Sequence, residues 1–572
     1  MFSLCAGRAL QIQAFDAAAY AAEAADQMTV SKPLYAVRGR ITDRFGDVLA
    51  YTEPTVMVVA DPTMIMTNGK FDARQTDADR AKAATAPGLI ADILARHLGG
   101  DAATYLAKLT VAGSKYQILQ KKVSSATFSD LSKELSEQKL IGIYRVSAPT
   151  RRYPNGTVAS NIVGFVNEEG KASAGLELAL NKDLAGKDGK EVYDSSPNGK
   201  IPLGDNVLVP AVDGKSYATT LDAGLQWEME QLIAQQVRVG NHLSATALAV
   251  DVKTGEVLGM ANFPSFDSND PGDGQTADMG NRAITNAYEP GSVQKTLTFA
   301  AMLDSGLITP DTVVKVPSAI KSGDYTIHDA QNHATVKMYA RGVLAKSSNV
   351  GTVTLARKLP KATLINYLQS FGLGRKTGLG LPGEGSGSLP KATMADYTRD
   401  SVAFGMGLSV TAIQEAAAVA AIANGGVYNP PKLLKSVTAA DGTTQQLPTA
   451  EPHRVISAEA ATQVAEMMEQ MVVHSVSGVF TVDGYRSAAK TGTAHRLDPA
   501  CKCYKGLVTS TIGFAPLEDP RILVYVVVET MNENGFGSTL AAPVYTDIMR
   551  LALPRYGVPP STTPSAKQPL YV

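Results

Sequence analysis

The run Ile-Leu-Val-Tyr-Val-Val-Val-Glu at 522–529 is apolar and rich in β-branched residues, which is typical of a strand buried on both faces of a sheet. Further strands are expected at 245–252, 256–260, 481–490 and 508–514. The intervening region 290–475 has mostly helical periodicity, and its alanine-rich segment 414–423 stops at Asn424-Gly425-Gly426. Strands at both ends with helices between them predict an α+β domain in which one antiparallel sheet is packed with helices.

The chain is too long, at 572 residues, for one hydrophobic core, so it is predicted to form several domains. A first α+β domain is expected at 31–212, with a strand at 56–60 and helices at 81–98 and 129–139. A Gly, Pro, Asn and Ser-rich break at 195–205 and a turn at 212–215 separate it from the next domain. That second domain is expected at 215–553 and opens with a helix at 225–239.

Both ends of the chain differ from these domains. Residues 1–30 are expected to form a helical segment, with the alanine-rich part at 15–28, and residues 554–572, rich in Pro, Ser and Thr, are expected to be a disordered tail. No stretch reaches the roughly 18 apolar residues that would span a bilayer, and the apolar start at 1–6 is too short for a signal peptide.

Charge and metal-ligand spacing exclude several classes of function. Lysine and arginine total 53 against 54 acidic residues, so no basic excess indicates nucleic-acid binding. The histidines show no metal-ligand spacing, and three cysteines are too few for a disulfide framework or a closed zinc site. Cys501 and Cys503 are therefore expected to have an incidental or local structural use, and no metal or cofactor is predicted.

Ser292 and Lys295 form a candidate activated nucleophile. They lie one helical turn apart after Pro290-Gly291, so the lysine amine can sit beside the serine hydroxyl and take its proton. The same Ser-x-x-Lys spelling also begins at Ser136, Ser318, Ser388 and Ser487. The pattern has no specificity unless other motifs accompany it.

Two such motifs follow Ser292 in the order found in penicillin-binding proteins and β-lactamases. Of three Lys-Thr-Gly copies, those at 253–255 and 376–378 fit turns, whereas the copy at 490–492 heads towards a predicted strand. Of two Ser-x-Asn copies, the one at 196–198 lies in the break and the one at 347–349 lies between the other two motifs. The ordered set is Ser292/Lys295, Ser347/Asn349 and Lys490/Thr491/Gly492.

The wider context resembles the transpeptidase domain of class B penicillin-binding proteins. The resemblance is carried by Tyr-Glu-Pro-Gly-Ser-x-x-Lys at 288–295, Lys-Ser-Ser-Asn-Val-Gly at 346–351, Ala-Lys-Thr-Gly-Thr-Ala at 489–494, Phe-Gly-Leu-Gly at 371–374, Leu-Pro-Gly-Glu at 381–384, Gly-Met-Gly at 405–407 and Gly-Phe-Ala-Pro at 513–516. The first domain resembles the family's non-catalytic pedestal, or dimerisation domain, through Arg-Gly-Arg-Ile-x-Asp-Arg at 38–44, Arg-Arg-Tyr-Pro at 151–154 and Gly-Leu-Glu at 175–177.

The resemblance implies a role for each motif residue. Ser292 would attack the carbonyl of a terminal D-Ala-D-Ala, with neutral Lys295 as the base and the charge of Lys490 lowering the pKa of Lys295. Ser347 would relay a proton to the leaving amine, and Asn349 would hold the substrate amide and orient Lys295.

The strand that carries Lys490 would bind the substrate. Thr491 would bind the substrate carboxylate, Gly492 would let the substrate backbone approach, and Thr493 would donate one oxyanion-hole N–H, the other coming from Ser292. A structural alternative remains open for each motif residue, such as a helix cap for Ser292 or a plain edge strand for Thr491.

The implied function is a peptidoglycan D,D-transpeptidase inhibited by β-lactams, and the short pedestal favours the septal, cell-division subgroup. The implied partners are stem peptides ending in D-Ala-D-Ala, β-lactams, a SEDS-type glycosyltransferase and divisome proteins that dock on the pedestal. The resemblance implies an extracytoplasmic catalytic domain at the cell membrane, although the family's anchor helix is absent from this chain. A D,D-carboxypeptidase or β-lactamase, or a catalytically idle scaffold, are the alternatives.

Overall fold

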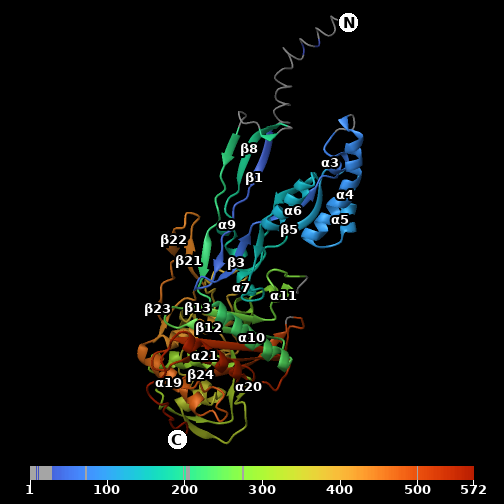
Figure 1. Cartoon of the computed structure of the whole chain (residues 1–572). Coiled ribbons are helices and arrows are strands. Elements are labelled where there is room, and N and C mark those ends of the chain that lie inside the picture. The colour runs from blue at the N-terminus through green and yellow to red at the C-terminus, as the bar shows by residue number, and fades with distance from the viewer. Residues whose placement is uncertain are drawn as a thin grey trace.

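The computed structural model describes residues 8, 11, 29–70, 74–196, 199–200, 206–272, 276–498 and 500–572. Figure 1 shows an elongated molecule in which the C-terminal domain lies at one end and the N-terminal region extends away from it as two arms. Within these described residues, no helix is both long enough and apolar enough to cross a membrane. Nearly all of the predicted helical segment at 1–30 falls outside the described residues.

The C-terminal domain is built on one antiparallel sheet, as predicted. Its strands run in the order β13 (Val257–Phe263), β12 (Ser244–Asp251), β26 (Ile522–Thr530), β25 (Cys503–Ala515) and β24 (Ala488–Asp498). β26 is central and buried, as its apolar run indicated. The strand predicted at 481–490 begins only at Ala488, because Asp483-Gly484 forms a turn in which Gly484 has a φ of +82°.

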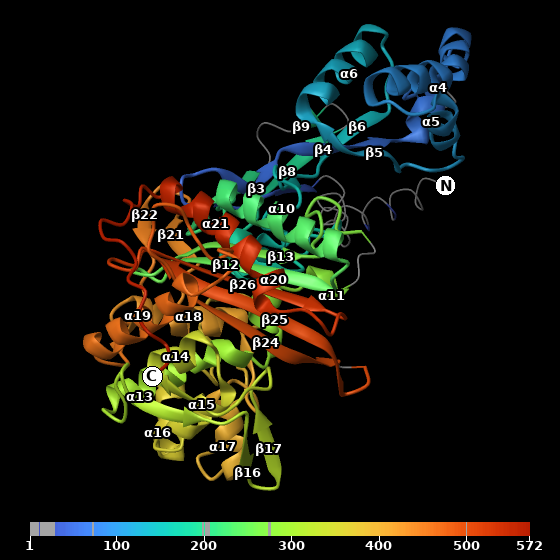
Figure 2. The same ribbon diagram turned by 90° about the horizontal axis from the view of Figure 1, so that it is seen from below.

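Alternate residues of the central strand face two separate cores, because side chains alternate across a sheet. Val524 and Val526 pack with α10 (Ala223–Gly240) and α21 (Ala542–Arg555). Tyr525 and Val527 face the other core, which contains α13 (Lys295–Asp304), α18 (Ala412–Ala423) and α19 (Ala458–Val473). Figure 2 shows the sheet between these two groups of helices.

Shorter elements complete the C-terminal domain. The helices are α11 (Thr276–Met279), α12 (Arg282–Thr285), α14 (Ala340–Ala345), α15 (Asn349–Ala356), α16 (Lys361–Ser370), α17 (Asp396–Ala403) and α20 (Gly537–Leu540). The strand pairs are β14 (Ala287–Tyr288) with β19 (Val410–Thr411), β15 (Val313–Val316) with β18 (Val336–Tyr339), β16 (Ala319–Ser322) with β17 (Tyr325–His328), and β20 (Val427–Tyr428) with β23 (His453–Arg454). The region 290–475 is therefore mostly helical, as expected, with small hairpins inserted.

The N-terminal region forms the two arms of Figure 1. One arm is a sheet of β1 (Thr29–Leu34), β8 (Gly189–Ser196), β9 (Gly199–Lys200) and β10 (Asn206–Val209). In the other arm, the sheet of β4 (Thr55–Ala60), β5 (Gln117–Ser124) and β6 (Ile143–Ser147) packs with α3 (Pro62–Thr67), α4 (Asp77–Leu98), α5 (Ala102–Leu109) and α6 (Ser125–Glu137) around its own core. A capping box formed by Thr76 and Asp79 starts α4.

A sheet shared by both domains joins them. Its strands run in the order β22 (Thr444–Gln446), β21 (Leu434–Thr438), β11 (Ser216–Thr219), β2 (Ile41–Thr42), β3 (Val48–Glu53) and β7 (Thr150–Arg152). β11 pairs parallel with β2 and antiparallel with β21, so the boundary predicted near residue 215 lies within a continuous sheet. Beside it lie three short helices, α7 (Ser160–Val163), α8 (Gly175–Ala179) and α9 (Asn181–Leu184).

A buried charge cluster brings together the predicted landmarks of the pedestal. Glu177 is fully buried, and its carboxylate lies 2.6 Å from the guanidinium groups of both Arg38 and Arg151. The cluster ties β7 and α8 to the segment before β2, because a buried carboxylate is stable only when its oxygens are paired.

Residues 554–572 differ from the expected disordered tail. They run along the C-terminal domain, where Gln470 bonds both Ala566 and Gln568 and Arg341 donates to the Pro569 carbonyl at 2.8 Å. Leu570 is 3% exposed, and Tyr571 forms a bridge with Met338 of β18. The prediction of disorder rested on composition alone. A segment rich in Pro and Ser can still be ordered without hydrophobic periodicity when its backbone groups form hydrogen bonds with the surface of a folded domain.

Candidate active site

Ser292 lies in a tight turn at the start of a buried helix. Gly291–Gln294 form a 3-10 helix that continues into α13. Gly291 has a φ of +58°, and a Cβ at this position would lie 2.7 Å from the Thr493 carbonyl oxygen. The backbone therefore passes so close to β24 at Gly291 that a side chain would not fit. Ser292 is partly exposed in a cavity, whereas Lys295 is fully buried beneath it.

The amine of Lys295 contacts the Ser-x-Asn motif directly. It donates to the Asn349 Oδ1 at 2.7 Å and to the Ser347 carbonyl oxygen at 2.6 Å, and it lies 3.2 Å from the Ser347 hydroxyl. Lys490 reaches the same hydroxyl, with its Nζ 3.0 Å from the Ser347 Oγ. The three motifs predicted from the sequence therefore meet around Ser347.

Burial makes both amines unusually acidic. Lys295 and Lys490 are 0% exposed. Desolvation, followed by the charge of Lys490, lowers the pKa of Lys295 well below its ordinary value, while Asp329 opposes this effect. Desolvation lowers the pKa of Lys490 to about 7. The surroundings of Lys295 therefore favour the neutral amine that a general base needs.

Asp329 holds the loop that presents Ser347. Ser347 has a left-handed φ of +58°, which costs free energy for a residue with a side chain. Asp329 accepts a hydrogen bond from the Ser348 hydroxyl at 2.7 Å and from the Val350 backbone N–H at 2.9 Å. Its Oδ2 also lies 3.1 Å from His333 Nε2. These bonds fix the turn between α14 and α15 in the strained conformation.

The third motif lies on β24, whose partner on one side is β25. Among the described strands none pairs with its other edge, which faces the 3-10 helix of Ser292. Gly492 is required here, because a Cβ would lie 2.7 Å from the Pro290 carbonyl oxygen and 2.5 Å from the Ser510 hydroxyl. Thr491 and Thr493 flank it and line the cavity.

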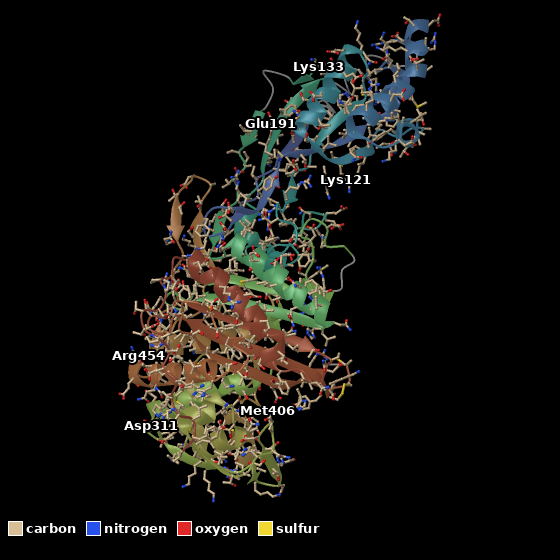
Figure 3. All side chains as sticks on the ribbon, turned by 60° about the horizontal axis from the view of Figure 1, so that its bottom comes forward. Lys121, Lys133, Glu191, Asp311, Met406 and Arg454 are labelled. Atoms are coloured by element: carbon tan, nitrogen blue, oxygen red, sulfur yellow. A yellow bond between two sulfur atoms is a disulfide. The ribbon has the colours of Figure 1, made fainter. Side chains whose placement is uncertain are left out.

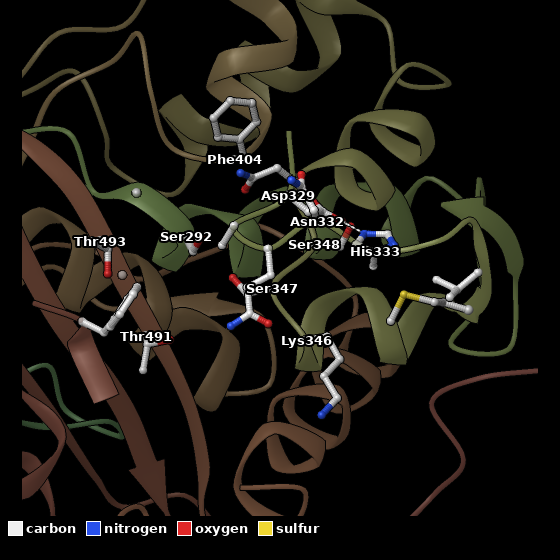
Figure 4. Close-up of a pocket in the computed structure, with 18 of the residues that line it drawn as sticks. Ser292, Asp329, Asn332, His333, Lys346, Ser347, Ser348, Phe404, Thr491 and Thr493 are labelled. Carbon is white, nitrogen blue, oxygen red and sulfur yellow. Dashed lines mark hydrogen bonds and ion pairs between the residues drawn. The ribbon is translucent and has the colours of Figure 1, made fainter. Parts of the chain in front are cut away.

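The cavity has a volume of about 610 Å³ and contains all three motifs. Figure 4 shows Ser292 between Thr491 and Thr493 on one side and Ser347 on the other, with His333 farther along and Lys346 beside Ser347. Of the predicted site residues, Ser292, Ser347, Asn349, Thr491, Gly492 and Thr493 line the cavity, while Lys295 and Lys490 contact Ser347 from below its surface.

Several lining residues had no signal in the sequence. They are Asp329, Asn332, His333, Phe404, Phe536 and Tyr571. His333 did not stand out because the histidines have no metal-ligand spacing. Tyr571 did not stand out because it lies in the segment expected to be a disordered tail. Only the path of the chain brings these residues to the cavity.

The competing motif copies lie elsewhere. Lys253-Thr254-Gly255 is the turn between β12 and β13, as predicted. In the copy at 376–378, Thr377 is hydrogen-bonded to Glu384 in a loop. The Ser-x-Asn copy at 196–198 falls partly outside the described residues.

The potential metal ligands and the cysteines form no second site among the described residues. No group of three or more His, Cys, Asp or Glu side chains there could hold a metal ion. Cys501 and Cys503 form a disulfide in the hairpin between β24 and β25, which is a local structural use.

Comparison with known proteins agrees with this architecture. Residues 245–550 match the family described as penicillin binding protein transpeptidase domain, and residues 33–218 match the penicillin-binding protein dimerisation domain. The chain therefore belongs to the penicillin-binding proteins that carry a transpeptidase domain behind a dimerisation domain.

Particular relatives are similar over nearly the whole chain. Penicillin-binding protein PbpB of Mycolicibacterium smegmatis is 35% identical, with 98% of this chain and 89% of the relative covered. Peptidoglycan D,D-transpeptidase FtsI of Escherichia coli is 31% identical, with 90% and 82% covered. The crystal structure of penicillin-binding protein 3 from Mycobacterium tuberculosis complexed with aztreonam has a TM-score of 0.70 at 29% identity, with 95% of this chain and all of that chain covered.

Proposed function

We propose that this chain is a peptidoglycan D,D-transpeptidase that cross-links stem peptides during septal cell-wall synthesis. The observation that carries the proposal is the contact of two buried amines, Lys295 and Lys490, with the Ser347 hydroxyl beside Ser292. A buried amine with a strongly lowered pKa is suited to proton transfer near neutral pH. The names of the relatives, a D,D-transpeptidase and PbpB, support the same reaction.

Acylation starts with Ser292. Neutral Lys295 takes the hydroxyl proton while the Ser292 oxygen attacks the carbonyl carbon of the penultimate D-Ala. The carbonyl oxygen gains negative charge in the tetrahedral intermediate, and the backbone N–H groups of Ser292 and Thr493 stabilise it. Thr491 binds the terminal carboxylate, and Gly492 lets β24 lie close to Pro290 beside the nucleophile.

Release of the terminal D-Ala needs a proton on its nitrogen. The proton held by Lys295 passes to the Ser347 hydroxyl, which is 3.2 Å away, and the Ser347 proton passes to the leaving amine as the C–N bond breaks. Lys490, 3.0 Å from the same hydroxyl, stabilises the transfer, and Asn349 holds Lys295 in position. The product is an ester of Ser292 and a free D-Ala.

Deacylation reverses these steps with a different amine. The acceptor amine attacks the ester carbonyl, its proton returns through Ser347 and Lys295 to the Ser292 oxygen, and the new peptide bond forms as the ester breaks. A β-lactam acylates Ser292 by the same first step but retains its leaving group, because the amine remains tethered in the opened ring. The aztreonam complex of a relative supports this inhibition.

The location and protein partners follow from the family. The catalytic domain acts outside the cytoplasm at the cell membrane, with a SEDS-type glycosyltransferase and divisome proteins bound at the pedestal. Figure 3 shows Lys121 and Lys133 on the pedestal, away from Met406, which lines the catalytic cavity.

Intact-mass measurement after incubation with benzylpenicillin tests the proposal. The wild-type chain is expected to gain the mass of one whole benzylpenicillin, and Ser292→Ala is expected to gain none. A wild-type chain that stays unmodified would indicate a scaffold without catalysis. An adduct that is lost rapidly with release of penicilloate would indicate a hydrolase instead.

A further inference from the structure

The C-terminal strap, residues 566–572, runs beside the cavity and forms an antiparallel bridge to β18 between Tyr571 and Met338. Tyr339 N donates to the Leu570 carbonyl and Val572 N to the Lys337 carbonyl, both at 3.1 Å. Gly342 lies directly under the strap, where a Cβ would collide with the Leu570 carbonyl. The strap is therefore a fixed part of the cavity wall.

This strap places Tyr571 at the cavity. Its side chain is about half exposed, and the residue lines the same cavity as Ser292. The residues around it form a far arm of the cavity: Asn332, His333, Val336, Met338, Lys346 and Tyr571. Figure 4 shows that His333 and Lys346 lie beyond Ser347 as seen from Thr493, so the far arm begins at Ser347.

Given the proposed function, the position of the far arm beyond Ser347 indicates which of the two substrates it binds. Thr493 and Ser292 bind the acyl group, whereas Ser347 meets the nitrogen that leaves. The acceptor amine must attack from the place that the leaving amine vacated, because aminolysis is the reverse of acylation. We propose that the far arm binds the acceptor strand, a peptide that carries the attacking amine and at least one carboxylate, with Tyr571 as its apolar wall.

The charges of the far arm fit such a peptide. His333 Nδ1 lies 2.7 Å from the Ala334 carbonyl and Nε2 lies 3.1 Å from the Asp329 carboxylate, and both of these partners only accept. A ring that donates from both nitrogens is an imidazolium, and the same two bonds raise the pKa of His333. Lys346, which follows the same cavity wall beside Ser347, is exposed.

The charges of His333 and Asp329 compensate each other, because the two groups lie 3.1 Å apart. Lys346 remains as an exposed cation of the far arm. It attracts the carboxylates of an acceptor peptide, and its charge disfavours protonation of the peptide's amine, which must be neutral to attack. The apolar surfaces of Met338 and Tyr571 then pack against the stem-peptide backbone.

The ratio of aminolysis to hydrolysis of the acyl-enzyme tests this assignment separately from the rate of acylation. The full chain is acylated with a thioester analogue of the donor, and hydrolysis is compared with aminolysis by two amines, a carboxylate-bearing stem tripeptide and free D-alanine. Tyr571→Ala is expected to lower the aminolysis-to-hydrolysis ratio for the tripeptide about tenfold, as loss of one aromatic contact implies. D-Alanine is too small to reach the far arm, so its ratio and the rate of acylation by benzylpenicillin are expected to stay unchanged.

Two further variants separate the far arm from general effects. Lys346→Gln is expected to weaken use of the tripeptide in the same selective way, and to lose less with a tripeptide whose carboxylates are amidated. Tyr116→Ala removes a similarly exposed tyrosine from the pedestal and serves as the matched control. Equal loss with tripeptide and D-alanine in Tyr571→Ala would overturn the assignment. A wild type that forms no adduct, or whose acyl-enzyme only hydrolyses, would instead overturn the proposed function.

Discussion

Lys295 and Lys490 both reach one hydroxyl group, with their amines 3.2 Å and 3.0 Å from the Ser347 Oγ. Both amines are fully buried, so each disfavours the charged state of the other. One amine can be neutral while the other stays charged, which is the arrangement that a base and an electrostatic partner need.

The first prediction concerns the pH dependence of acylation. The neutral form of Lys295 is the active base, so the second-order rate constant for acylation by a fluorescent penicillin is expected to rise with pH through the lowered pKa of Lys295. Lys490→Gln removes a neighbouring positive charge, which raises the pKa of Lys295 and moves this rise to higher pH. If the acylation rate of Lys490→Gln increases over the same pH range as that of the wild type, or at lower pH, the coupling of the two amines is contradicted.

The second prediction is that the buried amine lowers stability. The pKa of Lys490 is about 7 in the folded state against 10.5 as its ordinary value, so the unfolded state binds more protons between these pH values and the cost of folding is greatest at and below pH 7. Lys490→Met is expected to raise the unfolding temperature by roughly 2–5 °C at pH 7 and to lose this gain near pH 10. Thermal unfolding at both pH values checks this, and a gain independent of pH would indicate better packing instead.

Local patterns predicted the parts of the fold and site that depend on local sequence. The run at 522–529 predicted a buried central strand, and the order of the three motifs selected the set that meets around Ser347. The sequence did not indicate that one sheet joins the two domains. β11 pairs with strands of both domains, and pairing between distant segments leaves no local pattern in the sequence.

Residues of the site that depend on long-range contacts were not predictable. Asp329 lies 18 residues before Ser347 along the chain, and its role follows only from bonds to Ser348 and Val350 across a turn. Tyr571 reaches the cavity because its backbone joins β18, a contact between segments more than 200 residues apart. Composition alone assigned that segment to disorder.

The third prediction tests Asp329 as a positioning residue. Asp329→Asn weakens the bonds that hold Ser347 at its left-handed φ, so acylation is expected to slow by about 10- to 100-fold, the effect of misplacing a catalytic group. The variant also removes the charge that raises the pKa of Lys295, so the rise of the rate with pH is expected to move to lower pH. A slower rate with an unmoved profile would indicate a purely structural role. His333→Gln, which leaves the bonds to Ser348 and Val350 intact, is the control and is expected to retain most of the acylation rate.

The fourth prediction concerns the backbone around the nucleophile. Gly291→Ala places a Cβ 2.7 Å from the Thr493 carbonyl oxygen, in addition to the strain of a positive φ. Gly306→Ala has a similar φ of +66° but meets no atom within 4 Å, so it isolates the strain, which is about 1–2 kcal/mol. Gly291→Ala is expected to lose more stability than Gly306→Ala and to lose acylation almost completely. Equal losses in both variants would show that crowding against β24 is unimportant.

The last prediction separates the stability of the pedestal from catalysis. Glu177→Gln leaves Arg38 and Arg151 without their shared carboxylate, and breaking a buried ion pair in this way costs about 3–5 kcal/mol. The cluster lies in the pedestal, so calorimetry is expected to show the pedestal unfolding earlier while penicillin still acylates Ser292 at the wild-type rate. Lys122→Gln, which breaks an exposed pair with Glu168, is the control and is expected to change stability by less than about 1 kcal/mol. Joint loss of stability and acylation in Glu177→Gln would show that the shared sheet couples the two domains during unfolding.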